Sequence, residues 1–71
     1  MRAFRDPIDA LAYLTECTLA TVGHMQQLKN APKHELKRQM SIADKGLEAL
    51  RAFGDGRKFD GRVGAALEVS K

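Results

Sequence analysis

One broad apolar face runs along residues 8–28, IDALAYLTECTLATVGHMQQL. Side chains three and four positions apart share a face of an α-helix, because the helix has about 3.6 residues per turn. Apolar residues recur at this spacing over about six turns, which predicts one long amphipathic helix. The face consists of Ile8, Leu11, Leu14, Thr18, Leu19, Val22, Met25 and Leu28.

Residues on either side of this stretch mark the two ends of the helix. Asp6 can cap free backbone N–H groups, and Pro7 at the first helical position loses no hydrogen bond. The helix should end close to Asn30-Ala31-Pro32, because the residue before a proline is pushed out of the helical conformation. We therefore predict a first helix over about residues 7–29.

A second helix is predicted over about residues 32–53. Pro32 can open it after a cap at Asn30 or Ala31, and Glu35 complements the positive end of the helix dipole. Gly54 should end it in a left-handed conformation. Its apolar residues form a first stripe of Leu36, Met40, Ala43, Leu47 and Leu50, and a second stripe, about 100° away, of Ile42, Gly46, Ala49 and Phe53.

The short connection makes the two helices antiparallel neighbours in a hairpin. A hairpin alone cannot enclose a core, and Cys17 is the only cysteine, so no disulfide within the chain can stabilise it. We therefore expect an all-α protein in which two hairpins pair as a homodimer, a four-helix bundle. The expected dimer core is Leu11, Leu14, Val22, Met25, Leu36, Met40, Ile42, Leu47, Leu50 and Phe53.

The composition changes after residue 53. We divide the chain into a hairpin domain, residues 1–53, and a tail, residues 54–71, that is either flexible or packed as a short turn or helix. Phe59–Val63 contains an Asp-Gly turn signal, and residues 65–69 could add a helical turn. The alternative to dimerisation is that the tail folds back over the second stripe and completes the core of a monomer. The glycines that interrupt this tail are Gly54, Gly56, Gly61 and Gly64.

Positive charge gathers at the tip of the predicted hairpin. The whole chain has a net charge of only +3, whereas residues 6–28 contain no Lys or Arg. The tip could contact phosphates or an acidic protein surface, and the alternative is ordinary solvation of a turn. It has no aromatic residue for stacking bases, so nonspecific phosphate contact is the form of nucleic-acid binding left open. The candidate contact residues are Lys29, Lys33, His34, Lys37 and Arg38.

The polar side of the first helix carries small residues beside one tyrosine, a combination that can admit a close partner. The alternative is plain exposure to solvent. The candidate protein interface is Tyr13, Cys17, Ala20, Gly23, His24 and Gln27.

No catalytic, cofactor or metal site is expected. Cys17 and His24 project from one side of the first helix, but they are about 10 Å apart along its axis, too far for a nucleophile and its base or for one zinc ion. Glu16 stands alone on the solvent face.

These features favour a noncatalytic helical interaction module rather than an enzyme. The leading hypothesis is a homodimer that binds a larger protein and modulates or inhibits it, such as a small accessory factor of a bacteriophage or mobile element. Nonspecific nucleic-acid binding through the basic tips is the alternative. Since no stretch resembles a signal peptide or a membrane span, we expect a cytoplasmic protein without membrane contact.

Overall fold

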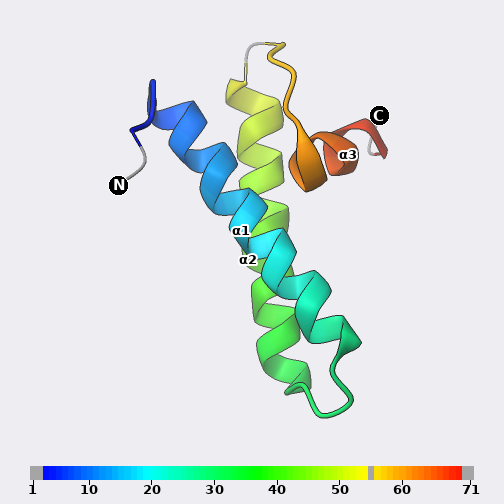
Figure 1. Ribbon diagram of the computed structural model, residues 1–71. Coiled ribbons are helices and arrows are strands. Elements are labelled where there is room, and N and C mark those ends of the chain that lie inside the picture. Colours follow the sequence, from blue (N-terminus) through cyan, green and yellow to red (C-terminus); the bar gives the residue numbers. More distant parts are fainter. Residues whose placement is uncertain (1–2, 55, 70–71) are drawn as a thin grey trace.

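The computed structural model describes residues 3–54 and 56–69, and over these residues the only regular elements are three helices. They are α1 (Pro7–Gln27), α2 (Lys33–Phe53) and α3 (Gly61–Val69). Figure 1 shows α1 and α2 as an antiparallel hairpin whose helices cross near their centres. The predicted all-α hairpin is confirmed, whereas its assembly into a four-helix bundle stays a prediction.

The start of α1 is the one that the sequence predicts. Asp6 is the N-cap, and its Oδ1 accepts a 2.8 Å hydrogen bond from the backbone N–H of Asp9. Pro7 follows as the first helical residue. The end comes two residues before the predicted position, because Leu28 is already extended, with φ −86° and ψ 134°.

Two predicted details of α2 are wrong. Pro32 is the N-cap rather than the first helical residue, so neither Asn30 nor Ala31 caps the helix, and no side chain bonds its first N–H groups. Gly54 has a right-handed φ of −75°. The left-handed conformation occurs later, at Gly56 and Gly61, with φ 75° and 65°.

The two long helices cross where Thr15 of α1 lies against Gly46 of α2. A methyl group added at Gly46 would overlap the Thr15 side chain, so only glycine allows this close approach. Thr15 is 4% exposed, and its hydroxyl donates a 2.8 Å hydrogen bond to the carbonyl of Leu11. The buried polar group is therefore satisfied within its own helix.

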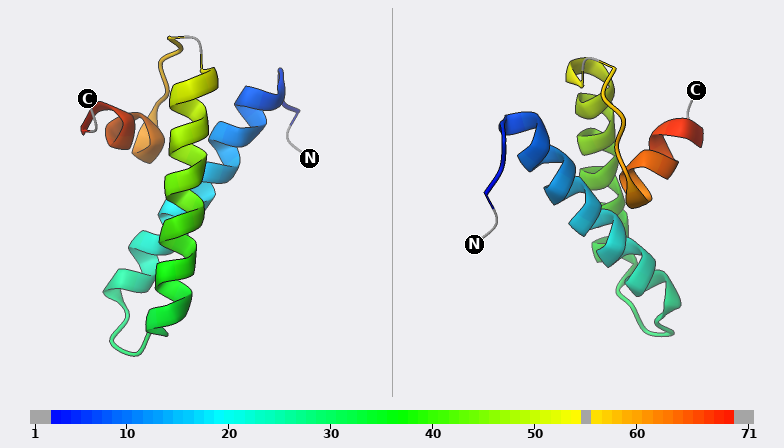
Figure 2. Two further views of the ribbon diagram at one scale, coloured as in Figure 1. Left: turned by 180° about the vertical axis from the view of Figure 1, so that it is seen from behind. Right: turned by 45° about the horizontal axis from the view of Figure 1, so that its top comes forward.

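The apolar core lies where α3 meets the hairpin. Leu47 and Leu50 of α2 and Val63 of α3 are its buried centre. Figure 2 shows α3 beside the C-terminal half of α2, on one flank of the hairpin. Partly buried side chains from all parts of the fold surround the centre: Ile8, Leu11, Ala12, Leu19, Phe59, Ala66 and Leu67.

The helix in the tail is longer than expected and lies in a different place. It begins at Gly61 rather than near residue 65, so the Asp-Gly pair lies at the start of a helix and forms no hairpin turn. The alternative that the tail covers the second stripe is wrong for the two large residues of that stripe. Ile42 and Phe53 remain 47% and 69% exposed, because α3 packs beside the first stripe instead.

Candidate interaction surfaces

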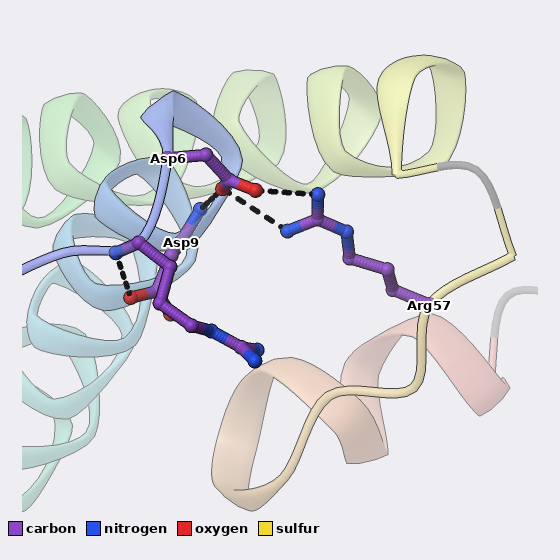
Figure 3. Close-up of polar contacts among 4 residues, drawn as sticks. Asp6, Asp9 and Arg57 are labelled. Carbon is purple, nitrogen blue, oxygen red and sulfur yellow. Dashed lines mark hydrogen bonds and ion pairs between the residues drawn. The ribbon is translucent and has the colours of Figure 1, made fainter.

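An ion pair joins the start of α1 to the segment before α3. Arg57 donates from Nη1 to Oδ1 of Asp6 at 3.1 Å and from Nη2 to Oδ2 at 2.6 Å, the paired geometry drawn in Figure 3. These hydrogen bonds from Arg57, with the one from the N–H of Asp9, lower the pKa of Asp6 from 3.8 to about 2. One carboxylate therefore caps α1 and ties the tail to it.

A second carboxylate caps α3 from another helix. Glu16 of α1 accepts hydrogen bonds from the backbone N–H of Arg62 at 3.1 Å and of Val63 at 2.8 Å. The Arg62 guanidinium lies 3.6 Å from Oε1 of the same carboxylate. Gly61 makes room, since a side chain there would crowd the carboxylate. The prediction that Glu16 stands alone on the solvent face is wrong.

A hollow of about 280 Å³ lies between α1 and residues 57–60. Charged side chains line much of it, and two of them already serve the contacts just described: Arg57 holds Asp6, and Glu16 caps α3. This hollow therefore belongs to the junction that fastens the tail to α1.

The predicted dimer-core residues separate into three groups. Val22, Leu47 and Leu50 are buried within the chain, and α3 of the same chain packs on the last two. Leu11, Met25 and Leu36 are half-buried. The remaining four, Leu14, Met40, Ile42 and Phe53, are exposed.

Three of the exposed apolar residues lie away from α3. Leu14 is two positions before Glu16, which places it about 160° around α1 from the carboxylate that holds α3. Ile42 and Phe53 lie about 120–140° around α2 from Leu47, which packs in the core beside α3. We call Leu14, Ile42 and Phe53 the apolar face; their side chains are 60%, 47% and 69% exposed.

The predicted basic tip is fully presented to solvent. All five candidate residues are exposed: Lys29, Lys33, His34, Lys37 and Arg38. The ion pairs of Asp6 with Arg57, at the other end of the hairpin, and of Glu16 with Arg62, near the middle of α1, do not involve these residues. Glu35, the acidic residue of the tip, accepts a 3.0 Å hydrogen bond from the side chain of Gln39 instead.

The candidate protein interface on α1 is open along its length. Cys17, His24 and Gln27 are exposed, whereas Ala20 and Gly23 are half-buried. Tyr13 is 39% exposed, and its ring centroid lies 5.5 Å from that of Phe4. A methyl group added at Gly23 would meet nothing within 4 Å, so no other part of the described chain requires glycine there.

The described part of the chain offers no cluster of three or more His, Cys, Asp or Glu side chains that could hold a metal ion. Cys17 and His24 lie seven positions apart on α1, as the sequence indicates. Over the same residues, none of the helices combines the length and apolar character needed to cross a bilayer. Comparisons of the chain with protein-family models, with curated proteins and with solved structures found no significant match.

Proposed function

We propose that this protein is a noncatalytic helical interaction module that pairs with a second copy through the apolar face and presents its outer surfaces to a larger protein. The observation that carries the proposal is the exposure of Leu14, Ile42 and Phe53, at 60%, 47% and 69%. Large apolar side chains gathered on one flank favour association, because water is released when they are buried.

The shape of the chain supports a second layer of helices. Its extents are 38 × 33 × 17 Å, so the chain is flat, with one dimension about half of the other two. α3 covers one flank, and the apolar face lies on the other. A second copy packed on the apolar face would give the bundle a core between layers, as expected for four-helix packing.

The charge layout is compatible with self-association. The apolar face contains no charged residue, so a twofold pairing that brings like residues together meets no repulsion at its centre. Arg38 and Lys45 lie four positions before and three positions after Ile42, beside the apolar face, whereas α1 has no Lys or Arg at all. Packing α1 of one copy against α2 of the other therefore keeps these cations apart.

The larger partner would meet the side of α1 that contains Cys17, Gly23 and His24. Its small residues let another backbone approach, and Tyr13 offers a rigid amphipathic ring of the kind that anchors protein interfaces. With a second copy on the apolar face, this side of α1 remains available. The module would then modulate or inhibit its partner by covering the part of the partner's surface that it binds.

Ile42→Glu tests the pairing. The side chain is 47% exposed, so the charge leaves the single chain folded, with unchanged helical circular dichroism, but enters the centre of the proposed interface unpaired. The expected result is a shift of the sedimentation mass from two chains to one. Ser41→Glu is the matched control, because it places the same charge one position away on an exposed site and should leave the dimer intact.

A dimer that persists in Ile42→Glu would show that the chain pairs through another surface. A wild-type chain that sediments as a monomer would overturn the pairing itself.

A further inference from the structure

We infer that the basic tip is a docking surface for the phosphate backbone of duplex nucleic acid. This inference goes beyond the proposed module and does not depend on it, since a monomer carries one complete tip and a dimer carries two. The surface comprises Lys29 in the loop and Lys33, Lys37 and Arg38 on the first turns of α2, with His34 between them.

The cations are arranged as one continuous patch. Lys33 and Lys37 are four positions apart on α2, so they lie on the same side and about 6 Å apart along the helix axis. Lys29 comes from the loop that precedes this helix end, and Arg38 extends the patch around it. Glu35 is about 160° around the helix from Lys33 and Lys37, whereas it is only about 60° from Arg38, on the side where Gln39 bonds its carboxylate.

The patch is not neutralised by the rest of the described chain. Asp6 is held by Arg57 at the far end of the hairpin, and Glu16, near the middle of α1, is held by the N-terminus of α3. Glu35 is bonded by Gln39. The four cations of the tip are exposed and take no part in either ion pair, so their charge is available to an outside anion.

The chemistry of the tip favours a polyphosphate over an acidic protein. Protein interfaces draw most of their affinity from buried aromatic or aliphatic anchors. Near the cations, the exposed large apolar side chains are Leu28, beside Lys29, and Met40, three positions after Lys37, and neither is aromatic. Binding to nucleic acid needs no such anchor, because release of condensed counterions from the phosphates supplies the free energy.

Charge density also favours duplex nucleic acid over an acidic peptide. Duplex DNA has one charge per about 1.7 Å of axis, whereas an extended acidic peptide has at most one per about 3.3–3.6 Å. A patch of three cations on the first two turns of α2 with a fourth on the preceding loop therefore meets more phosphates than carboxylates. Since the patch contains no aromatic side chain, the expected binding does not depend on base sequence.

The test measures binding of the full chain to a fluorescent DNA duplex of mixed sequence by anisotropy, at several salt concentrations. Four phosphate contacts predict a log–log slope of about −3.6, equivalent to a roughly 100-fold loss of affinity between about 50 and 200 mM salt. Lys33→Glu/Lys37→Glu should weaken binding at least about tenfold and reduce the slope by about 2. Glutamates suit the first turns of a helix, so this variant should fold.

Arg51→Glu/Lys58→Glu is the matched control. Each double variant changes the net charge from +3 to −1, by two units per substitution, and all four positions are exposed. The control should bind the duplex within about twofold of wild type at equal salt, because its charges lie at the other end of the hairpin.

Three results would overturn the inference. They are no binding at low salt, an equal loss of affinity in both double variants, and displacement of the duplex by polyglutamate at equal charge concentration. The last result would assign the tip to acidic proteins. A mass measurement on the same samples shows separately whether the chain is paired, so failure of the tip and failure of the dimer are distinguishable.

Discussion

The carboxylate of Glu16 on α1 accepts a 2.8 Å hydrogen bond from the backbone N–H of Val63 on α3, 47 residues further along the chain. It also accepts one from Arg62, so two of the free N–H groups at the start of α3 are bonded by another helix. Val63 itself is 2% exposed, in the core beside Leu50. The docking of α3 therefore depends on α1 rather than on a cap of its own.

Glu16→Ala should release the start of α3. We expect the free energy of unfolding to fall by about 1–2 kcal/mol, as for loss of a helix cap, and the Arg62 and Val63 amides to exchange faster with solvent. Urea denaturation and amide exchange measure the two effects. Glu48→Ala removes the same charge from an exposed site on α2 and should change stability by less than about 0.5 kcal/mol. Equal effects of the two variants would contradict the assigned role of Glu16.

The hairpin could be predicted from sequence because its signals are local. The apolar spacing of α1, the cap at Asp6 and the break at Asn30-Ala31-Pro32 all act within a few residues, and the structure has a helix on each side of that break. The capping role of Asp6 was predicted as well. Its second role was not, because the partner Arg57 lies 51 residues away and no local pattern connects the two.

The length of the third helix was underestimated because the contacts that stabilise it are not local in the sequence. Its first turns contain Gly61 and Gly64, which are weak helix formers. It is stabilised by distant groups, the Glu16 carboxylate and the buried contacts of Val63. Glu16 looked like a solvated side chain because the sequence does not show what lies against it. The exposed tip was predictable, since a run of cations around a short turn has little chain to cover it.

Stability should depend on Asp6 at acidic pH. Its pKa is lowered to about 2 in the folded chain from 3.8, so its contribution is complete above about pH 4 and is lost as the pH falls through about 2. Urea midpoints measured from pH 5 to pH 2 should therefore fall more steeply for wild type than for Asp6→Asn. Asp44→Asn, at an exposed position on α2, should retain the wild-type slope in this window. Parallel curves for wild type and Asp6→Asn would show that the ion pair with Arg57 does not stabilise the fold.

Gly46→Ala should destabilise the crossing of α1 and α2. The added methyl group overlaps the buried side chain of Thr15, so the helices must move apart, at a cost of about 1–3 kcal/mol. Thermal and urea unfolding measure the loss. Adding Thr15→Ala to this variant removes the overlapping atoms and should recover part of the stability, so the two substitutions should be non-additive. Additive losses would mean that the helices do not meet at this pair.

Gly23→Ala should stabilise the protein, whereas Gly46→Ala destabilises it. Position 23 is inside α1 and has open space around it, so alanine gains about 0.5–1 kcal/mol of helix propensity without a clash. The same unfolding experiments measure the gain, with Gly46→Ala as the paired comparison of one substitution in two surroundings. A loss of stability at Gly23 in the isolated protein would show that another chain already packs closely on this side of α1.

The most direct test of the central proposal is the solution mass of the wild-type chain by light scattering after size exclusion, in low and in high salt. Pairing through Leu14, Ile42 and Phe53 is apolar, and salt does not screen it. The predicted result is therefore a mass of two 7.8 kDa chains in both conditions. A mass of one chain in both would contradict the account, because the apolar face would then remain in water.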